Sequence, residues 1–143
     1  METFDPMDSR ISVDARSANP APILIGNSFP WALVERPVTA RPSSPTELRA
    51  RLEATGPAGI HSFWGHQNTL EAASAFSGTD LTPDSPRPSL SLNEEGLPTL
   101  DGTPFREVWL ISPRYRPGFR PAESGSVAPE DIERWQVLHL TWG

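Results

Sequence analysis

The sequence of 143 residues contains no cysteine and no lysine. Without cysteine the chain has no disulfide framework and no thiolate metal site. Without lysine it has no Schiff-base lysine and no P-loop lysine, so all 12 basic residues are arginine. Hydrophobic residues make up 36% of the chain, and 17 prolines shorten its regular elements. Any chemistry must therefore depend on histidine, arginine, carboxylate or hydroxyl groups.

Long apolar runs and a positive charge balance are also missing. No run approaches the roughly 18 residues of a membrane-spanning helix, and the first residues, METFDPMDSR, lack the pattern of a secretory signal. A formal net charge of −6 argues against binding long nucleic acid over a basic surface. We expect a cytoplasmic protein with no membrane partner, and a small anionic ligand stays open.

The length fits one domain. Residues 1–20 are polar, carry no periodicity and end in SANPAP, which predicts a disordered N-terminal tail followed by a single domain over 21–143.

Apolar runs bounded by turn residues predict strands in this domain. They lie at 22–25, 60–64, 89–92, 107–111 and 136–142, with a looser candidate at 31–40 that Pro37 would confine to a sheet edge. The segment 97–105 resembles an insertion between two of these strands.

Two helices complete the prediction. Ser44 to Glu47 form a capping-box pattern with proline at the first helical position, which predicts a helix over 44–55. The alanine-rich stretch 69–77 predicts a second helix, with Gly78 as its C-cap. The fold class expected is α+β, a small mixed sheet of about five or six strands with flanking helices.

The turn between the strand at 60–64 and the second helix carries the clearest candidate site. Free backbone N–H groups and the helix dipole favour a phosphate there, and Gly65 lets that phosphate approach the backbone. The residues concerned are Gly65, His66, Gln67, Asn68 and Thr69. Histidine exchanges protons near neutral pH, so His66 can act as a general acid. The alternative is that His66 only caps the helix or packs.

A second candidate region follows the strand at 107–111. Arg116 and Arg120 stand near Tyr115 and Phe119, a mixture suited to holding phosphates and stacking bases. Arg120 and Glu123 are three residues apart, where the arginine could stabilise charge on a phosphate and the carboxylate could orient it. An ordinary loop with a surface ion pair is the alternative.

The remaining histidines, His61 and His139, fall within predicted strands, away from this motif. The three histidines lack the spacing of a zinc helix, so we expect no metal.

These motifs, taken in order, resemble the type III anti-CRISPR ring nucleases, a family of viral proteins with CRISPR-associated cellular relatives. The resemblance covers roughly residues 22 to 132. It rests on a first strand ending in Asn27, on SFWGHQNT at 62–69, on the helix ending at Gly78, and on RPAESG at 120–125 before an acidic turn. The chain departs from the family pattern in its polar start, in the segment 97–105 and in the serine after Glu123.

The resemblance implies a two-fold homodimer that binds a cyclic oligoadenylate across its interface and cleaves it without cofactor or metal. A ribose 2′-hydroxyl would attack the adjacent phosphate while His66 protonates the departing 5′-oxygen. The family's catalytic histidine, arginine and glutamate correspond to His66, Arg120 and Glu123. The ligand-binding residues expected are Asn27, Ser28, Gly65, Gln67, Asn68, Thr69, Arg87 and Arg116.

Two other functions fit the same residues. A sponge would hold a cyclic nucleotide without cleaving it, with His66 only donating a hydrogen bond. An interaction module would instead dock its proline-rich segments, 83–88 and 113–121, on a partner protein.

Overall fold

The computed structural model describes residues 21–85, 88–120 and 127–143. The predicted tail over 1–20 lies outside these residues. Within them, no helix has the length and apolar character needed to cross a membrane.

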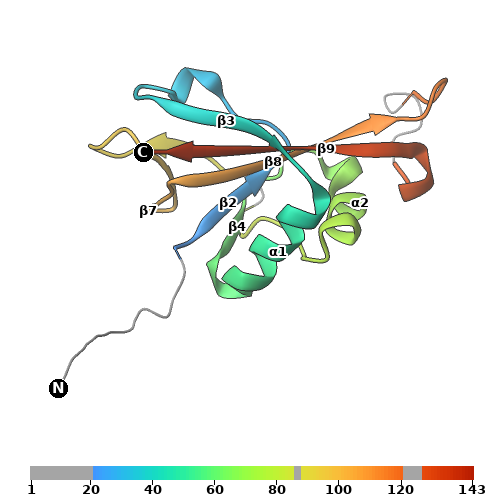
Figure 1. Cartoon of the computed structure of the whole chain (residues 1–143), viewed down its shortest axis with the longest axis horizontal. Helices are drawn as coiled ribbons and strands as arrows, with labels where there is room; N and C mark the ends of the chain where they lie inside the picture. Colours follow the sequence, from blue (N-terminus) through green and yellow to red (C-terminus); the bar gives the residue numbers. More distant parts are fainter. Residues whose placement is uncertain (1–20, 86–87, 121–126) are drawn as a thin grey trace.

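A mixed sheet of five strands forms the centre of the fold, in the order β3-β9-β8-β2-β4 (Figure 1). Its strands are β2 (Ile23–Gly26), β3 (Val38–Ser43), β4 (Ile60–Ser62), β8 (Glu107–Tyr115) and β9 (Ile132–Trp142). Strand β2 pairs in parallel with both β4 and β8, whereas β9 pairs antiparallel with β8 and β3. Of the three parallel strands, β2 and β4 therefore finish at the same end of the sheet.

Two helices cover one face of this sheet, α1 (Pro45–Thr55) and α2 (Gln67–Ser77). The opposite face carries a small antiparallel sheet of β5 (Leu90–Leu92), β6 (Pro98–Leu100) and β7 (Thr103–Pro104). Short 3-10 turns, η2 (Trp31–Leu33), η3 (Pro57–Gly59) and η4 (Pro129–Asp131), lie in the connections. The α+β class and the mixed sheet are confirmed, and the dimer stays a prediction.

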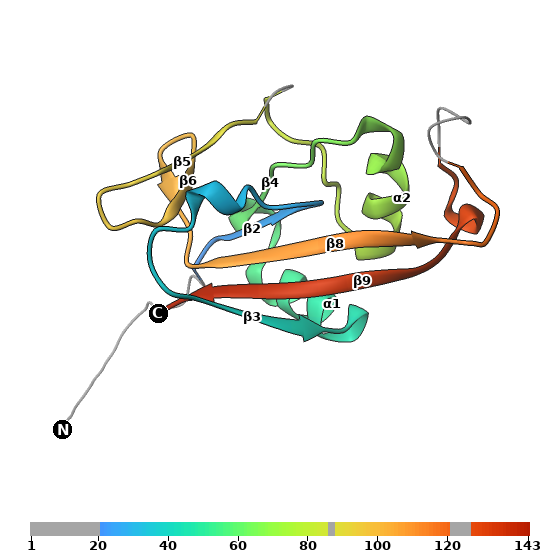
Figure 2. The same cartoon turned by 90° about the horizontal axis from the view of Figure 1, so that it is seen from above.

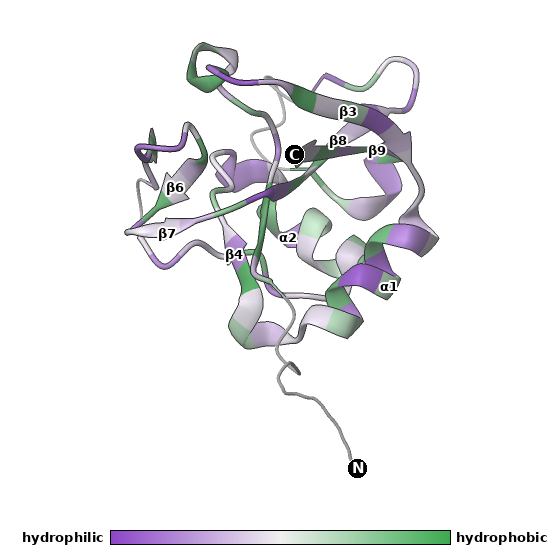
Figure 3. Cartoon of the chain, turned by 60° about the vertical axis from the view of Figure 1, so that its left-hand side comes forward, coloured by the Kyte–Doolittle hydropathy of each residue, from purple (hydrophilic) through white to green (hydrophobic). Residues whose placement is uncertain are grey.

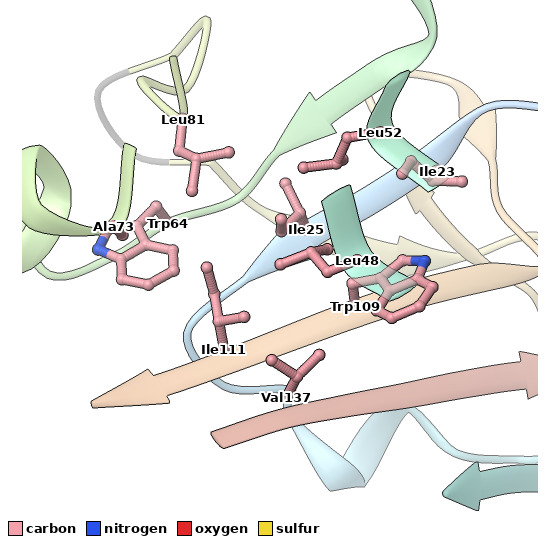
Figure 4. Packing of buried hydrophobic residues seen from close by; sticks show 10 residues of the cluster. All are labelled: Ile23, Ile25, Leu48, Leu52, Trp64, Ala73, Leu81, Trp109, Ile111 and Val137. Atoms are coloured by element: carbon pink, nitrogen blue, oxygen red, sulfur yellow. The ribbon is translucent and has the colours of Figure 1, made fainter. Parts of the chain in front are cut away.

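Successive residues of the central strands point into two separate cores, because side chains alternate across a sheet. Ile23 and Ile25 pack with Trp109, Leu48 and their neighbours under the helices, and Figure 4 shows how Trp64 and Trp109 point into this cluster. Leu24 packs on the other face. The four residues of β2 are all buried, which explains the continuous apolar run.

Helix α1 begins where its sequence predicts. The Ser44 hydroxyl accepts a hydrogen bond from the Glu47 backbone N–H at 3.1 Å, and Pro45 occupies the first turn. Leu48 and Leu52 are its buried residues, and hydrophilic and hydrophobic segments alternate along it in Figure 3. The chain leaves the helix through Gly56 at φ +81°.

Helix α2 begins two residues earlier than predicted, at Gln67, because only Gly65 and His66 form the turn. Its end is as predicted, with Gly78 in the left-handed region at φ +77°.

Two connections need detail beyond the prediction. Of the candidate strand at 31–40, the part from Val38 onward is a strand, and it continues to Ser43 as β3 at the sheet edge that Pro37 predicts. The segment 97–105 contains the strands β6 and β7, which the sequence did not predict, and Leu97, Leu100 and Phe105 are buried in the second core. Its turn at Asp101 and Gly102, both with positive φ, closes a hairpin.

Strands β8 and β9 are longer than their apolar runs predict. The last β8 residue paired with β2 is Leu110, and β3 pairs with β9 only as far as Val137. Beyond these points the two strands pair only with each other and extend past the rest of the sheet (Figure 2). The resulting arm brings Tyr115 alongside the end of the sheet where β2 and β4 finish.

Candidate functional site

The predicted site residues converge at the end of the sheet where β2 and β4 finish. Ile25 pairs with Ser62 in these parallel strands, so the loops that follow are neighbours. The Gly65 backbone N–H donates to Asn27 Oδ1 at 3.0 Å, and the Ser112 hydroxyl donates to the Asn27 carbonyl at 3.4 Å. Ligands of sheets with parallel strands commonly bind beyond these carboxyl ends.

His66 occupies the N-cap position of α2, but its side chain makes no capping hydrogen bond. The first turn of this helix contains no acidic residue. The backbone N–H groups of Gln67 and Asn68 have no intrahelical acceptor at these positions. The exposed His66 ring therefore lies beside free donors at the positive end of the helix dipole.

Trp64 fixes this helix start from below. Its indole Nε1 donates to the His66 carbonyl at 2.9 Å and lies 3.2 Å from Thr69 Oγ1. Trp64 is 1% exposed and Thr69 is 4% exposed. The indole is thus a buried anchor for the His66 backbone and not a surface on which a base could stack.

Five predicted site residues line one pocket of 430 Å³, which we call the His66 pocket. Its lining residues are Asn27, Ser28, His66, Asn68, Thr69, Pro113 and Tyr115. Burial raises the pKa of Tyr115, so its hydroxyl remains protonated at neutral pH and can donate a hydrogen bond. The pocket therefore combines hydroxyl, amide, imidazole and aromatic groups with the helix start.

Other predicted residues lie elsewhere. Gln67 lines a different cavity, on the side of α2 that faces Asp80. Arg116 pairs with Asp131 at 3.1 Å, and its guanidinium lies 5.6 Å from the centre of the Phe119 ring. The guanidinium of Arg116 therefore contacts a carboxylate and a ring close to its own loop.

Three further residues, Arg87, Arg120 and Glu123, were predicted at the site. Arg120 is exposed and lines none of the pockets around His66. Arg87 and Glu123 lie outside the described residues.

Sequence reasoning missed Pro113 as a pocket residue and grouped Tyr115 with the arginine loop. Both belong to β8, and Pro113 pairs with Trp135 of β9. Proline is tolerated there because β8 has already passed the end of β2 and has a single neighbouring strand. The stretch from Ile132 onward could have indicated this, because it forms the part of β9 that pairs with the end of β8.

The side chains of the two other histidines contact neighbouring residues within the fold. The His61 ring meets the Phe105 ring edge-on at 5.3 Å. His139 Nε2 lies 3.0 Å from Glu107 Oε2, and its ring stacks on Trp109 at 4.1 Å. In the described part of the chain, no group of three or more histidine, aspartate or glutamate side chains is placed to hold a metal ion.

Glu107 is the centre of this second polar group. It accepts a hydrogen bond from Trp109 Nε1 at 2.8 Å and pairs with Arg51 at 2.8 Å. Burial raises the pKa of Glu107, but the hydrogen bonds from Arg51 and Trp109 and the charge of Arg51 together bring it below its ordinary value of 4.5. This group holds α1 against the start of β8.

A larger cavity of 610 Å³ lies between α1 and the end of α2, lined by residues that include Arg49, Glu53 and Gly78. The Arg49 guanidinium donates two hydrogen bonds to the Phe76 carbonyl, at 3.0 and 2.9 Å, and lies 5.0 Å from the centre of the Phe76 ring. Arg49, the only basic residue among those that line this cavity, therefore already binds a carbonyl near the end of α2. The chemistry of the lining, more than volume, favours the His66 pocket.

Comparison with known proteins adds information on the fold. No family model matches the chain, and no curated protein matches it. Among solved structures, it is similar to B116 of Sulfolobus turreted icosahedral virus, with a TM-score of 0.53 and 12% sequence identity, over 85% of this chain and all of that one. At this identity the similarity shows a shared α+β fold.

Proposed function

We propose that the chain binds a cyclic oligoadenylate, in particular cyclic tetra-adenylate, and cleaves it without a metal ion. It would do so as a cytoplasmic homodimer and would switch off type III CRISPR signalling. The observation that carries the proposal is the convergence of Asn27, Ser28, His66, Asn68 and Thr69 on one pocket. The sequence predicts a catalytic or ligand-binding role for all five residues, which come from two separate stretches of the chain.

The pocket supports binding of a phosphodiester. The N–H groups of the first turn of α2 and the helix dipole favour a negative charge beside His66. Asn27 Oδ1 accepts a hydrogen bond from the Gly65 N–H, and the same side chain, which lines the pocket, also carries an NH₂ donor group. The Ser28 and Tyr115 hydroxyls add donors along the same wall.

The exposed ring of His66 is suited to proton transfer. In the proposed reaction the ribose 2′-oxygen bonds to phosphorus and the bond from phosphorus to the 5′-oxygen breaks. The imidazolium of His66 gives its proton to that oxygen, and the 2′-hydroxyl proton leaves to solvent. The products are a 2′,3′-cyclic phosphate and a 5′-hydroxyl, with no water consumed. General acid catalysis of this kind contributes about 100- to 10,000-fold in rate.

One observation favours a second candidate, the sponge. Of the two residues with assigned catalytic roles that the structure describes, His66 lines the pocket and Arg120 does not. A site that binds phosphate through α2 without the charge of Arg120 would hold the ring without cleaving it. The two functions share a ligand and differ in turnover.

The test is to incubate the protein in EDTA with cyclic tri-, tetra- and hexa-adenylate and to separate the products by chromatography. Linear fragments ending in a 2′,3′-cyclic phosphate are the expected result. Intact ligand recovered with the protein would establish the sponge instead. If the protein neither binds nor cleaves any of the three rings, both the nuclease proposal and the sponge proposal are overturned.

A further inference from the structure

A second pocket lies on the other side of His66. It has a volume of 340 Å³ and shares Asn27, Ser28 and His66 with the His66 pocket. Its own lining residues are Phe29, Pro30, Phe63, Gly65, Pro88 and Leu90, and we call it the aromatic pocket. The His66 ring thus stands in a wall common to two cavities.

The aromatic pocket has a rigid apolar floor. The Phe29 and Phe63 rings meet edge to face at 6.4 Å and 87°, and both are more than nine-tenths buried. Phe63 lies tightly over Gly26, where an added Cβ would approach its ring to 2.5 Å. The Phe63 ring is thus packed directly against the end of β2 and is in edge contact with the Phe29 ring.

The chemistry of this pocket differs from that of its neighbour. Apart from His66, none of its described lining side chains is ionisable, so among the described residues only His66 could offer a phosphate a counter-charge there. The helix start, with its free N–H groups, opens on the His66 pocket through Asn68 and Thr69. A flat, uncharged heterocycle suits the aromatic pocket, whereas the anion suits the other.

We infer that the aromatic pocket binds the nucleobase of one of the two nucleotides that flank the phosphate at His66. This inference rests on the proposed function. The phosphate and the other nucleotide then occupy the His66 pocket, with Tyr115 beside the second base. The smallest ligand that fills the site is a dinucleotide, linear or cyclic, and ring closure is unnecessary for local recognition.

The experiment uses a linear adenylyl-(3′,5′)-adenosine with a 2′-deoxyribose before the phosphate, which removes the attacking hydroxyl. Two further probes each lack one adenine. Calorimetry on the full chain compares wild type with Leu90→Trp, which fills the pocket, and Leu92→Trp, a control. Leu92 lies on the same strand, two residues away, and does not line the pocket.

Leu90→Trp should weaken binding of the complete dinucleotide by about 5- to 150-fold, the range expected for loss of one stacked base. Removing the adenine that occupies the pocket should weaken wild type similarly. The two changes together should cost no more than one alone, because both remove the same interaction. Leu92→Trp should bind like wild type. Leu90→Ala, a milder change, serves if the tryptophan variant does not fold.

The inference is overturned if Leu90→Trp binds the dinucleotide as tightly as wild type. It is also overturned if the effect of Leu90→Trp multiplies with the loss of one adenine and with the loss of the other, so that neither adenine shares its interaction. In both cases cleavage of cyclic tetra-adenylate by wild type would leave the proposed function intact. Failure of wild type to bind cyclic tetra-adenylate would overturn the proposed function and this inference with it.

Discussion

His139 lies within strand β9 and His66 directly precedes helix α2, and their surroundings differ. His139 pairs with Glu107, stacks on Trp109 and is 13% exposed in its side chain. His66 is exposed, and no ring interaction joins it to another described residue. Polar groups with partners stabilise the fold, whereas polar groups left without partners remain available to a ligand. The comparison supports a structural role for His139 and agrees with the functional role that we propose for His66.

The largest effect should come from His66→Ala. We expect the cleavage rate of bound cyclic tetra-adenylate to fall about 100- to 10,000-fold, because the general acid is lost. The free energy of unfolding should change by less than about 0.5 kcal/mol, since an exposed ring without partners is removed. Single-turnover kinetics and urea unfolding measure the two quantities.

His139→Ala is the matched control for this prediction. It should destabilise the protein and leave the cleavage rate per folded molecule unchanged. An unchanged cleavage rate in His66→Ala would contradict the assignment of His66, even if ligand binding were intact.

The next largest effect concerns the contribution of Glu107 to the stability of the fold. Glu107→Gln should lower the free energy of unfolding by about 1.5 to 3 kcal/mol, because hydrogen bonds between charged groups are lost and Arg51 keeps its charge. Glu95→Gln is the control, since its ion pair with Arg106 is 3.6 Å long and both side chains are more than half exposed. Equal losses in the two variants would show that the partial burial of Glu107 is unimportant.

Acid should act through the same carboxylate. The pKa of Glu107 is lower in the folded chain than its ordinary value of 4.5, so its charge stabilises the fold above that pH. This contribution should be lost as the pH falls from about 4.5 through the lower folded-state pKa. Urea unfolding between pH 6 and pH 3 should therefore show a weaker dependence on pH in Glu107→Gln than in wild type. Parallel curves would reject the link.

Local patterns were enough to predict part of this molecule. The apolar run that forms β2, the Ser44 cap of α1 and the turn at Gly65 and His66 depend on neighbouring residues, and each lies close to its predicted place. Asn27 and Gly65 were both predicted as ligand-binding residues, and the structure joins them by a hydrogen bond. Both were predictable because each lies in a turn that follows an apolar run.

Long-range pairing accounts for what was missed. Tyr115 reaches the pocket because β8 continues along β9, a contact between distant segments that no local pattern encodes. The pairing of Arg116 with Asp131, 15 residues away, was also not predicted, and its contact with a ligand stays a prediction. The hairpin at 97–105 contains turn residues typical of an exposed loop, and burial of Leu97 and Phe105 depends on the central sheet.

The smallest effects concern the two helix starts. Ser44 caps α1 with its hydroxyl, whereas His66 leaves α2 without a side-chain cap. Ser44→Ala should cost about 1 kcal/mol of unfolding free energy and leave cleavage per folded molecule unchanged. His66→Ser supplies the missing hydroxyl, so it should gain up to about 1 kcal/mol while abolishing cleavage. Urea unfolding and single-turnover assays of both variants would detect this reversal. A loss of stability in His66→Ser would mean that the His66 side chain already stabilises the start of α2. The N–H groups of the first turn would then not be the vacant donors that a bound phosphate requires.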